Sequence, residues 1–372
     1  MVEKDRHSAF SAINSDVWDD WKWQIANRIA SIEQIMSVDK GDKNDISAGL
    51  NKGFSVGITP YYAIHLEHHA LRKTIVPDEA ESVLTPGEFR DPLGEENHQV
   101  TPHLIHTYPD KVLFLATPFC STYCRYCTRS RMVGEPTSQR SRYEDSYAYI
   151  AAHSQIKDVL ISGGDPLTMS DGSLDEILTA LRAIPHVRIV RIGSKVPAVL
   201  PMRITPALCA ILQRHQVWLS LHFTHPAELL PETQSACVKL KESGIPMLNQ
   251  TVLLKGVNDH VSVLKELFYG LVEVGVKPYY LLQCDPVRGS AHFRTPVSTG
   301  IQIIKALHGY ISGVAIPQFV IDAPGGGGKV PLLSEDQLER KGDYIYFKNY
   351  QNKTFSYPDP IQHTTPSTIE IA

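Results

Sequence analysis

The 372-residue sequence lacks the features that mark nucleic-acid-binding and membrane proteins. It has 36 lysines and arginines against 40 acidic residues, a formal net charge of −4, and no basic block. A nucleic-acid partner is therefore not expected. No apolar run approaches the roughly 20 residues that span a bilayer, and the N-terminal stretch Met-Val-Glu-Lys-Asp-Arg-His is too polar for a signal peptide. We expect no membrane partner either.

Cysteine is also scarce, with six in the whole chain and no pattern that indicates a disulfide framework. Cys209, Cys237 and Cys284 are isolated in apolar or periodic segments. A chain without disulfides is typical of reducing compartments. We therefore expect a cytoplasmic location.

The other three cysteines lie together as C-x3-C-x2-C, at Cys120, Cys124 and Cys127. They follow the apolar run 112–116, which predicts a buried strand. Three thiolates on one loop are one short of a closed zinc site or a plain electron-transfer cluster. A [4Fe–4S] cluster held by three thiolates leaves one iron open for a ligand. The alternative is a loop with three free cysteines, which fits a polar loop poorly because free cysteine is usually buried.

From about residue 111 the pattern predicts an α/β fold, because short apolar runs alternate with amphipathic helical segments. The expected strands are 112–116, 158–162, 188–193, 217–223, 246–253, 279–284 and 318–321, and the expected helices are 143–152, 174–183, 206–214, 232–243, 261–274 and 301–311. About six βα units indicate a partial or complete barrel with its chemistry at the carboxyl ends of the strands.

The flanks of this region have different patterns. Residues 1–105 are expected to be mostly helical, with 17–35 at helical spacing and 79–97 as a surface connector. Residues 106–325 form the predicted barrel. Residues 326–372 hold a glycine-flanked lysine, a small hairpin of 343–347 with 354–357, and a tail.

Two glycine-rich segments follow predicted strands. The glycines of Ser162-Gly163-Gly164-Asp165 can admit a ligand and expose N–H groups to a carboxylate or phosphate. The alternative is an ordinary glycine turn that binds no ligand. Lys329 follows four glycines and is not part of a Walker A loop, because Ala323 and Val330 replace the required residues. Such a lysine can reach a cofactor aldehyde. On spacing alone, a solvated loop lysine is the simpler interpretation.

The cysteine motif, with Tyr126 before its last cysteine, resembles the radical S-adenosylmethionine (radical SAM) superfamily. The longer string 120–129 resembles the lysine 2,3-aminomutase family, as do 162–165, 278–294 and 322–329. The similarity extends from about residue 18 to about residue 360. It implies a partial (β/α)6-type radical SAM barrel with an N-terminal helical region and a small C-terminal extension. It also implies a [4Fe–4S] cluster on the three cysteines.

The same resemblance implies contacts to two further cofactors. Ser162, Gly163, Gly164 and Asp165 match the segment that binds the amino group of S-adenosylmethionine. Tyr126 would lie near its adenine, and His222 and Gln250 would contact it; a lone buried histidine is otherwise more often a core residue. Lys329 matches the lysine that holds pyridoxal 5′-phosphate (PLP), and Tyr108 and Lys111 match a segment that helps to hold it. The family has arginine where this chain has Thr107 and Lys111, and neither reproduces a bidentate grip on phosphate.

For the substrate, the resemblance assigns Arg129 to an amino-acid carboxylate, and Asp285 and Asp322 to the ε-ammonium of lysine. Each residue alone could equally be a helix cap or a surface ion pair. Relatives that act on glutamate have non-acidic residues at the two aspartate positions, so lysine is favoured. His260 stands where well-known aminomutases have a zinc-binding cysteine, and the tail has no cysteine, so zinc is not expected.

The implied activity is that of an isomerase, a lysine 2,3-aminomutase that converts L-lysine to β-lysine with an unidentified one-electron donor. Three alternatives stay open: the same chemistry on glutamate or arginine, β-lysine formation for modification of a translation factor, and a radical SAM enzyme without PLP. A non-enzymatic iron–sulfur or electron-transfer protein is the alternative from another class. A homo-oligomer is compatible with the sequence, which does not specify an oligomeric state.

Overall fold

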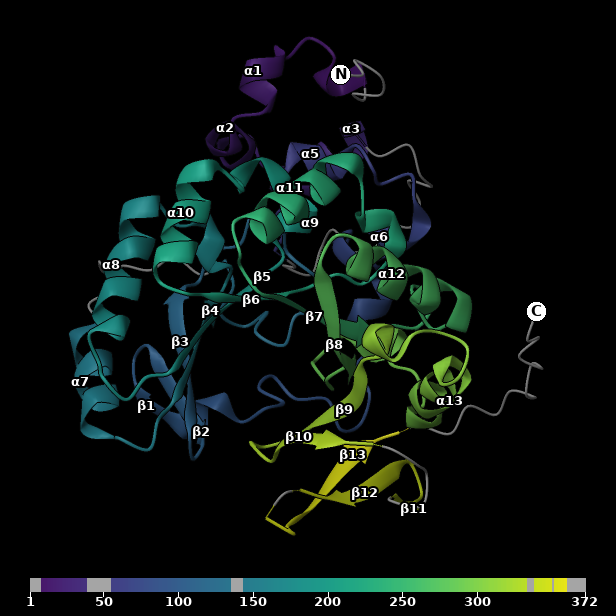
Figure 1. The fold of residues 1–372 in the computed structure, drawn as a ribbon. Helices are drawn as coiled ribbons and strands as arrows, with labels where there is room; N and C mark the ends of the chain where they lie inside the picture. The colour runs from purple at the N-terminus through teal and green to yellow at the C-terminus, as the bar shows by residue number, and fades with distance from the viewer. Residues whose placement is uncertain (1–7, 39–54, 135–142, 333–337, 350, 360–372) are drawn as a thin grey trace.

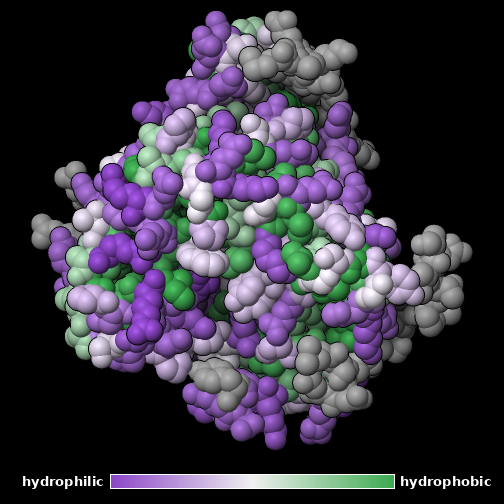
Figure 2. All heavy atoms as spheres, viewed as in Figure 1, coloured by the Kyte–Doolittle hydropathy of each residue, from purple (hydrophilic) through white to green (hydrophobic). Residues whose placement is uncertain are grey.

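A computed structural model describes residues 8–38, 55–134, 143–332, 338–349 and 351–359. Figure 1 shows a curved central sheet with helices on its outer side, short N-terminal helices at one end and a small separate sheet at the other. Polar side chains cover most of the face seen in Figure 2, with hydrophobic residues visible between them. No helix in the described part of the chain is long and apolar enough to cross a membrane.

The central sheet has ten strands that lie in sequence order. Its seven middle strands are parallel and its edge pairings are antiparallel. The strands are β1 (Gln99–Thr101), β2 (Leu104–Tyr108), β3 (Lys111–Thr117), β4 (Asp158–Gly163), β5 (Ile189–Ser194), β6 (Trp218–Leu221), β7 (Met247–Leu253), β8 (Val276–Gln283), β9 (Gln318–Ala323) and β10 (Gly328–Pro331). No pairing among the described residues joins β1 to β10, so the barrel is open. All seven predicted strands are present, which confirms the partial α/β barrel.

Six helices provide the crossovers between the parallel strands, as the periodicity predicts. They are α7 (Glu144–Ala152), α8 (Asp171–Arg182), α10 (Pro206–Arg214), α11 (Pro231–Glu242), α12 (Val261–Glu273) and α13 (Val297–Leu307), with the short α9 (Val196–Val199) before α10. Strand alternation separates the two faces of the sheet. On β4, Val159 and Ile161 are fully buried in the main hydrophobic core, whereas Asp158 and Ser162 belong to the opposite face. The inner face therefore carries the polar side chains.

The N-terminal region differs from the continuous helical stripe expected over 17–35. It forms α1 (Ser15–Trp18), α2 (Trp21–Ala26) and α3 (Ile32–Val38). The side chains of Asn14 and Asp20 accept hydrogen bonds from backbone N–H groups and start new helices there. Ile29 then pairs with Ile58 in a β-bridge, which interrupts the helix. Among the described residues, α5 (Pro60–Ala63) and α6 (His69–Ile75) follow.

Residues 79–97 are only partly a surface connector: Val83, Leu84 and Phe89 are exposed, but the segment also packs into the protein. The 3-10 helices η3 (Glu79–Ser82) and η4 (Glu95–His98) bury Glu81 and Glu95. Glu81 forms a bidentate pair with Arg125, and the Phe89 N–H donates to the Pro286 carbonyl at 2.9 Å. The acidic residues suggested exposure, but arginines of the cysteine loop satisfy their charges inside the protein.

The C-terminal hairpin is confirmed, with one strand added. Strands β11 (Glu339–Lys341), β12 (Tyr344–Lys348) and β13 (Thr354–Pro358) form an antiparallel sheet. The Tyr357 hydroxyl donates to the Cys284 carbonyl at 2.5 Å, which fastens this sheet to the end of β8. The expected tail after residue 360 lies outside the described residues.

Candidate active site

The cysteine loop leaves the carboxyl end of β3 and is fastened to the N-terminal region. The Tyr123 N–H donates to Gly57 and the Arg125 N–H to Thr74, at 2.7 and 2.8 Å. Arg28 donates to the carbonyl of Cys120, and its guanidinium lies 4.5 Å from the ring centre of Phe119. The 79–97 segment adds the pair between Glu81 and Arg125. The loop is thus rigidly held, which a polar surface loop would not be.

The three thiols of this loop, on Cys120, Cys124 and Cys127, are half-buried and lie close enough to influence one another's ionisation. Burial, with the neighbouring Cys124, raises the pKa of the Cys127 thiol to about 11. Three thiolates here therefore need a cation to balance their charge. No three cysteine, histidine or acidic side chains in the described chain converge as ligands of a single ion. A [4Fe–4S] cluster takes each thiolate on a different iron, so these cysteines fit a cluster better than one metal ion.

The glycine segment after β4 packs directly against the cysteine loop. Gly163 has φ +113°, and a Cβ there would collide with the Thr117 carbonyl. A Cβ on Gly164 would overlap the carbonyl of Phe119. The N–H groups of Gly164 and Asp165 donate to Thr117 and Phe119. These two N–H groups are thus unavailable to a carboxylate or phosphate, contrary to one expectation from the glycines. Binding of an amino group, which needs acceptors, is compatible with this arrangement.

Asp165 is buried beneath this segment. It accepts hydrogen bonds from the Ser194 hydroxyl and the Lys195 N–H, both at 2.8 Å. Burial raises its pKa to about 6. These bonds tie the end of β4 to the end of β5. Asp165 therefore anchors the glycine turn to the end of β5.

A buried ion pair lies beside the cysteines and was not predicted. The Lys195 ammonium is 2.5 Å from the Glu228 carboxylate, which also accepts from the Tyr62 hydroxyl at 2.9 Å. Lys195 also donates to the carbonyl of His222. Burial and the nearby Lys195 charge lower the pKa of the His222 ring to about 4, so this ring is neutral at pH 7.

The other residues expected to contact S-adenosylmethionine lie at the same end of the sheet. Tyr126 is buried and meets Phe293 edge-on with ring centres 6.0 Å apart. Gln250 is buried on β7, and its backbone raises the pKa of His222 through a hydrogen bond that partly offsets the effect of burial. Tyr126, His222 and Gln250 are thus grouped around the cysteine loop.

Arg129 lies within reach of both the cysteine loop and the substrate residues. Its Nε and Nη2 contact the two oxygens of Glu95, with Nη2 2.6 Å from Oε1, and its Nη1 lies 3.3 Å from the Ser162 hydroxyl. Arg131 donates to the other oxygen of Glu95 at 3.1 Å. Although burial works against ionisation, the two arginines hold the pKa of Glu95 below its usual value. Glu95 was missed because the 79–97 segment looked like surface.

Asp285, Asp322 and Lys329 converge at the ends of β8, β9 and β10. Both oxygens of Asp322 accept from the Lys329 ammonium, at 2.8 and 2.6 Å. Asp285 accepts from the Thr128 hydroxyl at 2.6 Å. Burial, and then the charge of Asp322, raises the pKa of Asp285 to about 7. Arg129 is close enough for Asp285 to raise its pKa. The structure thus groups the three expected substrate residues with the lysine.

Lys329 also meets the residues expected to hold PLP. Its N–H donates to the Tyr108 hydroxyl at 2.7 Å, and the Lys111 ammonium lies 4.2 Å from the centre of the Tyr108 ring. Gly328 has φ +80°, and a Cβ there would press on Tyr108. A lysine on the inner face, an aromatic ring and a second cation fit an aldehyde cofactor that carries phosphate.

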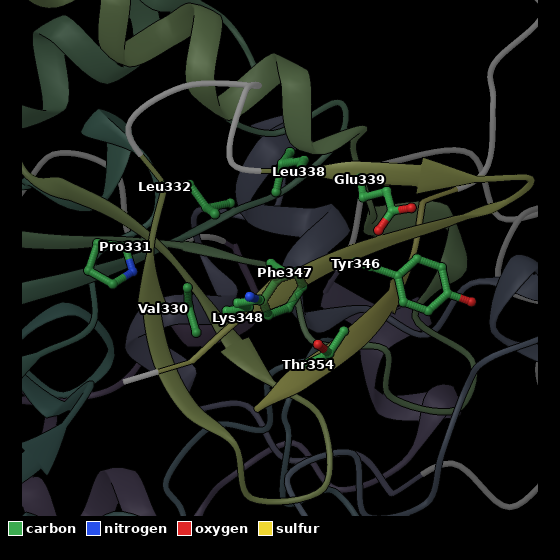
Figure 3. Close-up of a pocket in the computed structure, with 9 residues that line it drawn as sticks. All are labelled: Val330, Pro331, Leu332, Leu338, Glu339, Tyr346, Phe347, Lys348 and Thr354. Carbon is green, nitrogen blue, oxygen red and sulfur yellow. The ribbon is translucent and has the colours of Figure 1, made fainter. Parts of the chain in front are cut away.

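A separate groove of about 410 Å³ lies on the other side of β10, between that strand and the C-terminal sheet. Figure 3 shows the residues that line it, which are Val330, Pro331, Leu332, Leu338, Glu339, Tyr346, Phe347, Lys348 and Thr354. Side chains alternate along a strand, so Val330 faces this groove while Lys329 faces Asp322. None of the expected site residues lines the groove.

Comparison with known proteins finds similarity to radical SAM proteins and to amino-acid 2,3-aminomutases. Residues 114–267 match the model of the radical SAM superfamily, and residues 304–370 match the model described as lysine-2,3-aminomutase. The chain is 42% identical to the L-lysine 2,3-aminomutase of Fusobacterium nucleatum, over 96% of this chain and 87% of that protein. It is 42% identical to the Clostridium subterminale L-lysine 2,3-aminomutase, over 98% and 90%. Identity to the glutamate 2,3-aminomutase of Clostridioides difficile is 35%, over 96% and 87%.

Proposed function

Because the chain belongs to the lysine 2,3-aminomutase family of the radical SAM superfamily, we propose that it converts L-lysine to β-lysine by moving the 2-amino group to C3. When bound, the cluster and S-adenosylmethionine supply a radical that takes hydrogen from C3, and PLP supplies an aldehyde through which nitrogen migrates. The observation that carries the lysine assignment is the pair of carboxylates, Asp285 and Asp322, grouped with Arg129 in one site.

The lysine substrate would be held by charge at both ends, the α-carboxylate and the ε-ammonium. Arg129 offers its Nη1 edge to the α-carboxylate, since Nε and Nη2 already contact Glu95. Asp285 and Asp322 accept the ε-ammonium, and Asp322 already holds an ammonium, that of Lys329. Glutamate would bring a third carboxylate toward these two, and like charges repel. The charges of the site therefore favour lysine over glutamate.

The cofactor residues have complementary tasks in this proposal. Cys120, Cys124 and Cys127 hold the cluster and leave one iron open for S-adenosylmethionine. The segment Ser162 to Asp165 receives its amino group, while Tyr126, His222 and Gln250 surround the rest. Lys329 holds the PLP aldehyde, with Tyr108 and Lys111 beside it. His222 is neutral at pH 7, so it can accept or donate a hydrogen bond without adding charge.

In this proposal the chain has three parts, which are an N-terminal helical region, 1–105, a barrel, 106–325, and a C-terminal part, 326–372. A reduced cluster requires a one-electron donor and protection from oxygen, which supports a cytoplasmic location. A homo-oligomer is compatible with the proposed chemistry.

Amino-acid selectivity tests the proposed function. The reconstituted protein is incubated without oxygen with PLP, S-adenosylmethionine, dithionite and either lysine, arginine or glutamate, and β-amino acids are quantified. We expect β-lysine to form with the highest kcat/KM. A preference for glutamate would overturn the lysine assignment. An iron–sulfur protein without enzymatic function would give no β-amino acid from any substrate and no cleavage of S-adenosylmethionine.

A further inference from the structure

A layer of charged side chains lies on the inner face of the sheet, where barrels usually pack branched apolar side chains. Lys111 on β3, Asp158 on β4 and Arg191 on β5 belong to it. Lys111 and Asp158 are direct neighbours in the strand register. Nε and Nη2 of Arg191 donate to the two oxygens of Asp158, at 3.0 and 2.8 Å. Two cations thus share one carboxylate within the barrel.

Strand alternation and a contact across the barrel show which way Arg191 faces. Its neighbours Val190 and Ile192 are fully buried in the core beneath the helices, so Arg191 belongs to the inner face, with Gly193. Strands β6 and β7 separate β5 from β8. Even so, although burial raises the pKa of the Tyr280 hydroxyl on β8, the charge of Arg191 partly offsets that effect. An interaction that skips two strands must cross the interior.

Tyr280 links Arg191 to the lysine proposed to hold PLP. The Lys329 ammonium lies 6.0 Å from the centre of the Tyr280 ring. Tyr108 is close enough to Tyr280 to influence its ionisation, and its hydroxyl accepts from the Lys329 N–H. Lys329 and Arg191 therefore face the same interior space, on either side of Tyr280 in the chain of contacts.

The described residues do not balance the positive charge of this layer. Asp158 occupies Nε and Nη2 of Arg191, and Nη1 has no hydrogen-bond partner among the described residues. The Lys111 ammonium forms no ion pair within those residues and lies only against the Tyr108 ring. A partly buried cation without a partner is costly. One carboxylate against two cations leaves room for an anion.

We propose that Arg191, together with Lys111, binds the phosphate of PLP. The inference rests on the proposed function, which places the aldehyde end of this cofactor on Lys329. A guanidinium offers a planar fork that matches phosphate, and an ammonium does not. Arg191 thereby supplies from β5 the guanidinium that residues 107 and 111 lack. Asp158 holds the fork in place from behind.

The test compares PLP with pyridoxal, which has the aldehyde but no phosphate. Binding is measured by absorbance titration of the wild type, Arg191→Gln and Arg188→Gln, without substrate. Arg188 is an exposed residue just before the same strand and serves as the matched control. A charged hydrogen bond to phosphate corresponds to about a tenfold to hundredfold effect on Kd. We expect Arg191→Gln to weaken PLP by that factor and to leave pyridoxal unchanged, and Arg188→Gln to change neither.

Equal weakening of both ligands would mean a structural role and would overturn the inference, as would unchanged binding of PLP. If Arg191→Gln does not fold, Arg191→Lys is measured instead. It keeps the charge without the fork, so PLP should weaken and pyridoxal should not. Borohydride reduction of the wild type, followed by peptide mapping, distinguishes failure of the proposed function, PLP on Lys329, from failure of the role proposed for Arg191. Absence of a pyridoxyl group on Lys329 contradicts the proposed function itself, whereas a labelled wild type with an unchanged PLP preference in the variant contradicts only the role of Arg191.

Discussion

The guanidinium of Arg129 is held by the carboxylate of Glu95, with Nη2 2.6 Å from Oε1 and Glu95 almost fully buried. This pair fixes which edge of Arg129 remains available to a substrate. Removing one partner of a buried ion pair typically costs about 3–5 kcal/mol. In this pair, removing the charge of Glu95 would also release Arg129 from its present orientation. If Arg129 binds the substrate carboxylate as proposed, Glu95 is a positioning residue for substrate binding.

Replacing Glu95 by Gln should raise KM for lysine by about tenfold or more and change kcat much less. The reason is that Arg129 loses the charge that orients it, while the cofactors stay in place. Steady-state kinetics check this, with Glu96→Gln as the control because Glu96 is exposed and its one ion pair among the described residues is with Arg131. Exposed pairs contribute about 0–1 kcal/mol. Equal effects of the two variants on KM would remove the positioning role.

Gly164 should be essential to the cluster for a steric reason. A Cβ at this position overlaps the Phe119 carbonyl, so Gly164→Ala must displace the cysteine loop. We expect loss of most of the iron bound after anaerobic reconstitution. Gly172→Ala is the control, because a Cβ there meets nothing within 4 Å. Iron analysis and the visible spectrum compare the two variants. A full iron content in Gly164→Ala would contradict the packing described here.

The cysteine ligands can be tested in the same way. Cys124→Ala should abolish cleavage of S-adenosylmethionine, because two thiolates do not complete the three-cysteine site. Cys209→Ala should leave cleavage intact, since Cys209 is a buried residue of α10 with no role in the site. Methionine release under reducing, oxygen-free conditions is the measurement. Normal release by Cys124→Ala would refute the ligand assignment.

Activity on lysine should depend on pH through Asp285. Burial and the charge of Asp322 raise the pKa of Asp285 to about 7, so Asp285 is neutral below that pH and anionic above it. The ε-ammonium of lysine stays charged throughout, with a pKa of about 10.4. We therefore expect kcat/KM for lysine to rise as pH increases through about 7 and then to level off.

Asp322→Asn provides the decisive comparison for this profile. Removing the like charge lowers the pKa of Asp285, so the inflection should move to lower pH. The variant should also lose two orders of magnitude or more in kcat/KM, because one carboxylate of a buried ionic site typically contributes about 3–5 kcal/mol, and about 1.4 kcal/mol is tenfold. An inflection at the wild-type pH in Asp322→Asn would assign the titration to another group.

The parallel strands and their helices could be predicted because each shows a strong local pattern. The short apolar runs 158–162 and 318–321 correspond closely to β4 and β9. The N-terminal helices could not be placed, because the caps at Asn14 and Asp20 and the bridge between Ile29 and Ile58 interrupt a regular stripe. The last of these depends on a partner 29 residues away, which periodicity does not reveal.

Some residues of the candidate site could also be predicted from the sequence, and others could not. The cysteines, Lys329 and the two aspartates lie in recognisable motifs. Glu95, Glu228 and Arg191 do not, because their roles arise from pairing with residues distant in the sequence. An acidic residue in a turn-rich segment is usually exposed, so Glu95 gave no local signal of burial. Arg191 showed only a polar position within a predicted strand, which is the one clue that its face is not part of the core.

Migration of the amino group itself tests the central claim most directly. Lysine labelled with 15N at the 2-amino position is incubated without oxygen with the reconstituted protein, PLP, S-adenosylmethionine and dithionite, and the product is examined by 13C and 15N NMR. We predict β-lysine with the 15N on C3, formed only when both cofactors are present. Lysine recovered unchanged while S-adenosylmethionine is cleaved, or 15N released to solution, would contradict the account.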